Sequence, residues 1–152
     1  LKKDVEVEFI EIAELPLYNQ DFDGLEEQPS AYVSFRNKVK AVDGLIIVTP
    51  EHNRAMPAAL KNALDVGSRP WGQSVWNGKK AIVVSQSPGK LSGFGAATQV
   101  KNVLSFLNVV TIAQPEAYLA ESHTLFDEKS LLISEETKKF FALLAKALVD
   151  FI

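Results

Sequence analysis

The chain has 152 residues, a length that suits one domain with a buried hydrophobic core. Hydrophobic residues make up 47% and charged residues 23%, and the net charge is −3, so nucleic acid and anionic membrane surfaces are not expected as partners. Because the chain has no cysteine, disulfides, thiol catalysis and cysteine-based metal sites are excluded, and the composition fits a cytoplasmic protein. No apolar run reaches the length of a membrane span.

The first third of the chain predicts a strand and a helix. Residues 5–12 (VEVEFIEI) alternate apolar and charged side chains, which is typical of a strand with one wet face. Ser30 is a candidate N-cap for a helix with Arg36 on its solvated face. The apolar stripe of this helix consists of Tyr32, Phe35, Val39 and Val42.

Two buried strands follow. Residues 44–49 (GLIIVT) and 80–87 (KAIVVSQS) are short apolar runs, as expected for strands covered on both faces. Pro57 is well placed in the first turn of the helix between them. Residues 96–107 form the next predicted helix, and residues 109–113 (VVTIA) form a weaker strand.

Ser134 is the predicted N-cap of a C-terminal helix, because two glutamates occupy its first turn. Strands thus alternate with helices along the whole chain, which predicts a parallel sheet between two helical layers. Ligands bind such sheets beyond the carboxyl ends of the strands. Two polar loops, TPEHNRAMP and SQSPGKLSGFG, are expected at that edge.

The two loops carry groups that could hold a planar heterocycle. The first offers an amide (Asn53) and charged side chains, and the second offers hydroxyls and three glycines that allow close approach to the backbone. The same residues are also ordinary turn formers, so both interpretations stand at this point. A metal site is not expected, because the two histidines lie far apart and there is no cysteine.

The segment TPEHNRAMPAALKNALDVGSRP resembles the TPEYN-x-S-x-P-x-x-LKNA-D signature of the NADPH-dependent FMN reductase family. These flavodoxin-like enzymes include quinone, chromate and azo-dye reductases. The segment GKKAIVVSQSPGKLSGFGAATQVKNVLSFLNV also resembles the part of the family that follows. The similarity runs from about residue 5 to residue 110 and continues more loosely to the end.

The resemblance implies an enzyme that binds FMN and passes hydride from NADPH or NADH to a quinone, azo dye, metal oxyanion or free flavin. It implies no catalytic side chain, because hydride transfer at flavin N5 depends mainly on orientation. It also implies a homodimer or homotetramer. His52 stands where the family usually has tyrosine, and Gly95 where it often has arginine. The implied cofactor-binding residues are Pro50, Glu51, His52, Asn53, Arg54, Ser87, Gly89 and Gly93.

A flavodoxin-type electron carrier, which needs a partner reductase, is the alternative. The resemblance also predicts a sheet of strand order 2-1-3-4-5, with one strand more than this chain supplies. The strand not found is the first, together with the phosphate loop that follows it, a turn of the form GSxRxxSxN. We therefore expect residues 1–152 to form a single flavodoxin-like domain that is incomplete at its N-terminal side.

Overall fold

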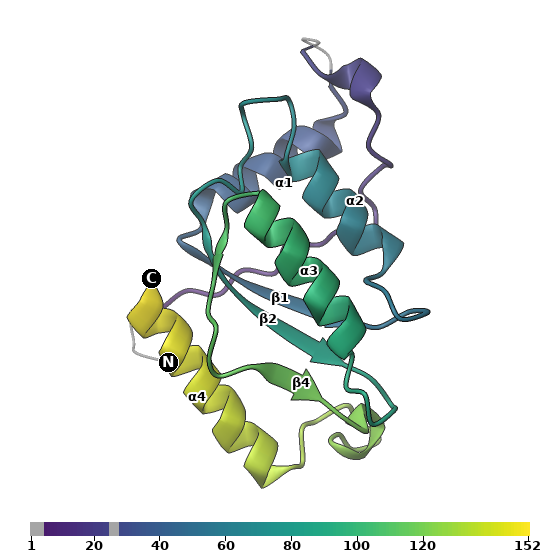
Figure 1. Ribbon diagram of the computed structural model, residues 1–152, viewed down its shortest axis with the longest axis vertical. Coiled ribbons are helices and arrows are strands. Elements are labelled where there is room, and N and C mark those ends of the chain that lie inside the picture. Colours follow the sequence, from purple (N-terminus) through teal and green to yellow (C-terminus); the bar gives the residue numbers. More distant parts are fainter. Residues whose placement is uncertain (1–4, 25–27) are drawn as a thin grey trace.

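A four-stranded parallel sheet with helices on both faces forms the centre of the computed structural model, which describes residues 5–24 and 28–152 (Figure 1). This confirms the predicted α/β class. The elements are α1 (Ser30–Ala41), β1 (Gly44–Pro50), α2 (Ala58–Gly67), β2 (Lys80–Gln86), α3 (Phe94–Phe106), β3 (Val110–Thr111), β4 (Ala117–Leu119) and α4 (Glu135–Phe151), with short 3-10 turns at Gln20–Phe22 and Ser122–Thr124.

The sheet is built around β2. On one side β2 pairs with β1 along its whole length, from Gly44 opposite Lys80 to Pro50 opposite Gln86. On the other side β3 pairs with the start of β2, and β4 pairs with its end. The predicted strand at residues 109–113 is therefore shorter than expected, and β4 was not predicted. The order β1-β2-β3/β4 agrees with the 3-4-5 part of the predicted order.

The strand predicted for residues 5–12 is wrong, because this segment forms no strand in the structure. Val7 and Phe9 are 58% and 93% exposed. The alternating pattern is present, but a strand also needs a neighbour that accepts its backbone hydrogen bonds. No described strand pairs with it, so the segment runs as coil, and only its residues Ile10 and Ile12 pack against the core.

Helix α1 differs from its prediction in two ways. Ser30 is the first helical residue rather than the cap, since Pro29 occupies the N-cap position and no side chain caps the helix. Arg36 is buried rather than solvated, and its Nε donates to the carbonyl oxygen of Val66 at 2.8 Å. The predicted apolar stripe is confirmed, because Tyr32, Phe35 and Val39 are buried.

The two faces of the sheet bury unequal cores. Helices α1, α2 and α3 cover one face over a large core that includes Leu64, Val100 and Leu104. Only α4 covers the other face, over a smaller core that includes Leu144 and Leu148. The predicted cap of α4 is confirmed, because Ser134 Oγ accepts a hydrogen bond from the backbone of Thr137.

The face under α4 is only partly covered. Ile46 and Val48 are 52% and 64% exposed there, and they line an apolar groove of about 720 Å³ together with residues of α4 and β4. Among the described strands, β1 pairs with β2 alone, so its other edge has no partner. None of the helices in the described ranges is long and apolar enough to cross a membrane.

Candidate functional site

The first predicted loop forms a tight turn at the carboxyl end of β1. The backbones of His52 and Ala55 exchange two hydrogen bonds of 2.9 and 2.8 Å. Asn53 and Arg54, the two central residues, have φ angles of 50° and 66°, as in a type I′ turn. Asparagine tolerates this left-handed conformation better than most residues, so the turn holds the exposed Asn53 amide at the edge of the sheet.

Glu51 fastens the first loop to the start of α3. Its side chain is only 7% exposed, and its Oε2 accepts a hydrogen bond from the backbone N–H of Ala96 at 3.1 Å. A carboxylate is stabilised there by the positive end of the helix. Its Oε1 contacts Nη1 of Arg54 at 3.3 Å. The carboxylate of Glu51 thus shapes the site and is not available to a ligand.

Gly95 allows this close approach of the first loop to α3. A Cβ atom at this position would lie 2.8 Å from the carbonyl oxygen of Arg54 and 2.9 Å from Oε2 of Glu51. Both distances are shorter than van der Waals contact. The packing of the first loop against α3 therefore requires glycine at position 95, where the family often has arginine.

The second loop is held by its own serines. The buried Ser85 donates its hydroxyl to the carbonyl oxygen of Ser92 at 2.9 Å, and Ser87 Oγ accepts from the backbone of Gly89 at 3.1 Å. Gly93 caps α3 with a φ of 76°, and a Cβ there would meet the carbonyl oxygen of Gln86 at 3.0 Å. Gly93 is thus needed for loop geometry.

A third segment, after β4, joins the site and was not predicted. The backbone of Ser87 donates to Leu119 and accepts from Ser122, each at 3.1 Å. The hydroxyl of Ser122 also contacts Oε1 of Gln86 at 2.5 Å. The hydrophobic pattern of the sequence did not predict this segment. β4 has only three residues, which is too short for an alternation of apolar and polar residues to be recognised.

Two apolar side chains lie exposed beside these polar loops. Leu91 in the second loop and Phe94 at the start of α3 are 58% and 56% exposed. The rings of Phe94 and Tyr118 pack in a T-shaped arrangement at a centroid distance of 5.5 Å. An amide, backbone groups and apolar surface at one sheet edge form a combination that can hold a flat ring with a polar rim.

A cluster of Lys101, Glu116 and Tyr118 links α3 to β4 through side-chain hydrogen bonds. Lys101 Nζ donates to Glu116 at 2.7 Å and to the Tyr118 hydroxyl at 3.1 Å. Burial opposes the charge on Lys101, but these two bonds outweigh it and raise the pKa of the lysine. The bond from Lys101 lowers the pKa of Glu116, and burial together with the bond to Glu116 raises the pKa of Tyr118.

The structure brings most of the predicted site residues to one edge of the sheet. Pro50 ends β1, His52, Asn53 and Arg54 form the exposed turn, and Ser87, Gly89 and Gly93 lie in the loop after β2. A parallel sheet with helices on both faces and polar loops after adjacent strands defines a flavodoxin-like protein, a class that binds ligands at the carboxyl edge of the sheet.

Comparison with known proteins places the chain in a family. The family model described as NADPH-dependent FMN reductase matches residues 1–124. A quinone reductase of Pseudomonas putida is 46% identical over 134 residues, which are 88% of this chain and 71% of that protein. A 2-hydroxy-1,4-benzoquinone reductase of a Burkholderia species is 41% identical, over 90% of this chain and 74% of that protein.

Comparison with solved structures also finds an oxidoreductase of similar fold. The flavoenzyme NAD(P)H:(acceptor) oxidoreductase FerB of Paracoccus denitrificans superposes with a TM-score of 0.86 and 32% identity, covering 95% of this chain and 79% of that one. The chain therefore belongs to the NADPH-dependent FMN reductase family. It is an FMN-dependent oxidoreductase that uses NAD(P)H.

Proposed function

We propose that the protein is a quinone reductase. It transfers a hydride from NAD(P)H, by way of FMN, to a quinone, which takes up a proton and leaves as the hydroquinone while NAD(P)⁺ is released. The support is the identity of 46% and 41% to two quinone reductases, together with the Asn53 turn at the carboxyl edge. Azo dyes, metal oxyanions and free flavin are further acceptors of the same electron-transfer chemistry.

We propose that the flavin ring lies against the turn after β1 and the loop after β2. FMN supplies the two-electron redox chemistry when it is bound. Asn53 has an exposed side chain with no hydrogen bond to another described residue, so its amide is free for a polar ring edge. The remaining proposed contacts come from backbone groups of Pro50, Glu51, His52, Ser87, Gly89 and Gly93 and from the guanidinium of Arg54.

The nicotinamide and the acceptor would use the apolar surface formed by Leu91 and Phe94. Both side chains are more than half exposed beside the second loop. Flat apolar rings pack well on such side chains, and shielding the reacting atoms from water limits side reactions. No proton donor on the protein is required, because the quinone oxygen can be protonated by solvent.

We also propose that a further strand and helix complete this domain. The free edge of β1 and the apolar groove that exposes Ile46 and Val48 are features that folded proteins usually cover. The family resemblance implies that the same unit carries the phosphate-binding loop for FMN. Residues 1–152 expressed alone should then be insoluble or flavin-free. Cooperative unfolding and micromolar FMN affinity of that polypeptide would contradict this proposal.

The proposal also includes a homodimer or homotetramer that works in the cytoplasm with a small-molecule acceptor. Trp71 is 80% exposed, and such an aromatic side chain is well suited to an interface between subunits. The lack of cysteine suits a protein of the reducing cytoplasm. Sedimentation should give a dimer or tetramer at micromolar concentration, and a monomer would contradict the assembly.

One assay tests the function directly. The native protein is mixed with FMN, NADPH and a benzoquinone, and the nicotinamide absorbance is followed with time. Oxidation of NADPH without an added reductase is expected. Reduction of the quinone only after a separate reductase is added would instead identify a flavodoxin-type electron carrier.

A further inference from the structure

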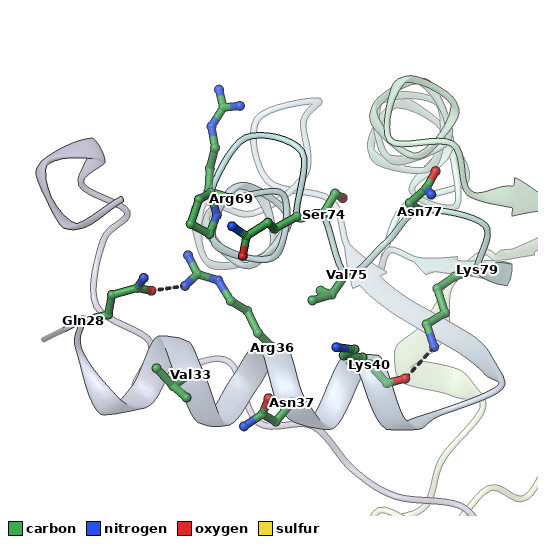
Figure 2. Close-up of a pocket in the computed structure, with 12 residues that line it drawn as sticks. Gln28, Val33, Arg36, Asn37, Lys40, Arg69, Ser74, Val75, Asn77 and Lys79 are labelled. Atoms are coloured by element: carbon green, nitrogen blue, oxygen red, sulfur yellow. Dashed lines mark hydrogen bonds between the residues drawn. The ribbon is translucent and has the colours of Figure 1, made fainter. Parts of the chain in front are cut away.

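A second cavity lies at the opposite end of the sheet from the flavin loops. It has a volume of about 680 Å³ and is formed by α1 and the connector between α2 and β2 (Figure 2). These elements meet where β1 and β2 begin, whereas the flavin loops follow the ends of the same strands. The quinone reductase reaction proposed above makes no use of this cavity.

The cavity is strongly cationic, although the protein is acidic overall. Four of its lining side chains are positive, and none of its lining residues is acidic; the positive ones are Arg36, Lys40, Arg69 and Lys79. The one carboxylate that acts on Arg36 is that of Asp23, outside the cavity lining, and it already accepts a hydrogen bond from Tyr18 at 2.7 Å. Concentrated positive charge of this kind attracts anions.

Arg36 is held firmly in place but is not fully bonded. It is 9% exposed, its Nε donates to the carbonyl oxygen of Val66 at 2.8 Å, and its Nη1 donates to Gln28. Its Nη2 is buried and has no partner. Burial lowers the pKa of Arg36, so its surroundings disfavour the charge that an anion would stabilise.

A second buried donor without a partner lies in the same cavity. It is the hydroxyl of Ser74, a lining residue on the connector between α2 and β2 (Figure 2). Arg36 Nη2 and Ser74 Oγ are the buried side-chain nitrogen and oxygen atoms without a partner in the described ranges. Because buried polar groups are nearly always hydrogen-bonded in folded proteins, two such donors in one cationic cavity indicate a ligand that accepts hydrogen bonds.

The other polar groups set the chemical class of this ligand. Lys79 Nζ donates to the carbonyl oxygens of Lys40 and Val42, so it contributes its charge from a fixed position. Guanidinium, ammonium and hydroxyl groups together match a phosphate, which has several acceptor oxygens and a full charge. The volume exceeds what a single phosphate fills, and the amides of Asn37 and Asn77 suit a polar sugar or base.

We propose that this cavity binds a phosphate ester of nucleotide size, independently of the flavin. Arg36 and Ser74 donate to its phosphate, and Lys40 and Lys79 provide the surrounding positive charge. The site is thus a second ligand site of the enzyme, at the amino ends of the strands.

Calorimetric titration of the native protein with AMP and with pyrophosphate, at constant ionic strength in a phosphate-free buffer, tests this proposal. Saturable binding of both is expected. Lys40→Gln and Ser74→Ala should each weaken it at least threefold, and the double variant at least tenfold. Ser74→Ala removes only an unbonded hydroxyl, so it leaves the fold intact and keeps the test valid if a change at Arg36 unfolds the protein.

Lys38→Gln is the matched control, because Lys38 lies on the same helix and pairs with Glu8 at 3.5 Å, outside the cavity. It should bind both probes as the unmodified protein does. Absence of saturable binding would overturn the proposal. So would binding that Lys40→Gln and Ser74→Ala leave unchanged, or that Lys38→Gln weakens equally, since charge alone would then explain it.

Discussion

The two ends of the sheet use their polar side chains differently. At the carboxyl ends, Glu51, Ser85 and Ser87 are bonded to loop backbone, and the exposed Asn53 remains free. At the amino ends, the buried Nη2 of Arg36 and the buried hydroxyl of Ser74 have no partner. The side chains at the carboxyl ends of the strands therefore already have hydrogen-bond partners, whereas two buried donors at the amino ends have none.

This difference agrees with the two kinds of ligand that we propose for the two ends. A flavin site needs correctly placed backbone and a flat surface, so side chains that fix loops contribute indirectly. A site for a small anion needs donors aimed at it, and those donors stay unsatisfied until it arrives. The following predictions test this contrast, from the largest expected effect to the smallest.

Replacing Gly95 by alanine should have the largest effect. The added Cβ would lie 2.8 Å from the carbonyl oxygen of Arg54, so the loop after β1 and the start of α3 must move apart. Overpacking of this kind costs about 1–3 kcal/mol. Denaturant unfolding should show this loss, and fluorescence titration should show weaker FMN binding.

Gly89→Ala is the control for stability. A Cβ at Gly89 would meet only Ser87 Oγ, at 3.6 Å, which is ordinary contact. Its free energy of unfolding should stay within about 0.5 kcal/mol of the unmodified protein. Equal stability of the two alanine variants would show that the close approach at Gly95 does not hold the loops together.

Replacing Asn53 by alanine should weaken FMN binding about tenfold or more. Loss of a polar contact typically costs about 1–3 kcal/mol, and about 1.4 kcal/mol corresponds to a factor of ten. Titration with FMN measures the change. Asn53→Gly keeps a residue suited to the φ of 50° and removes only the amide, so it should bind FMN equally weakly.

His52→Tyr introduces the residue that the family usually has, and it should leave FMN affinity nearly unchanged. If Asn53→Gly instead binds FMN as tightly as the unmodified protein, the amide does not contact the flavin. The turn conformation alone would then account for any effect of alanine at this position.

Two buried serine hydroxyls should respond differently to alanine. Ser85 donates to Ser92 at the carboxyl end, so Ser85→Ala should lower the free energy of unfolding by about 1 kcal/mol. Ser74 has no partner at the amino end, so Ser74→Ala should change it by about zero in a buffer without phosphate. If urea unfolding gave equal losses of free energy for Ser85→Ala and Ser74→Ala, the two hydroxyls would not differ in bonding as the structure shows.

Replacing Glu116 by glutamine should have the smallest effect on stability. The size of this effect should depend on pH. The bond from Lys101 lowers the pKa of Glu116, so its contribution is present above the ordinary carboxyl pKa and is lost as the pH falls through the lowered value. The variant should be slightly less stable than the unmodified protein at pH 7 and equal to it in strong acid.

Glu128→Gln provides the control for that pH profile, because Glu128 is exposed and forms no ion pair with another described residue. Its thermal unfolding should follow the unmodified protein at every pH. A constant difference between Glu116→Gln and the unmodified protein across the whole range would exclude the ion pair as the cause.

The sequence by itself determined the α/β class and placed two polar loops after β1 and β2. Unbroken apolar runs predicted β1 and β2, and β2 is buried on both faces as expected, whereas Ile46 and Val48 of β1 are more than half exposed. The TPEHN segment predicted the loop after β1, since local backbone conformation decides which residues suit its turn. Ser134 likewise capped α4 as predicted, because N-capping depends on a few neighbouring residues.

Tertiary structure decided the features that depend on distant partners. Residues 5–12 have a strand pattern but no neighbouring strand, and Arg36 has the polarity of a surface residue but lies under the connector between α2 and β2. The family resemblance implied that Glu51 binds the cofactor, whereas the structure shows that its carboxylate accepts a hydrogen bond from the backbone of Ala96. These outcomes depend on which groups lie nearby in space, and local sequence carries little information on that.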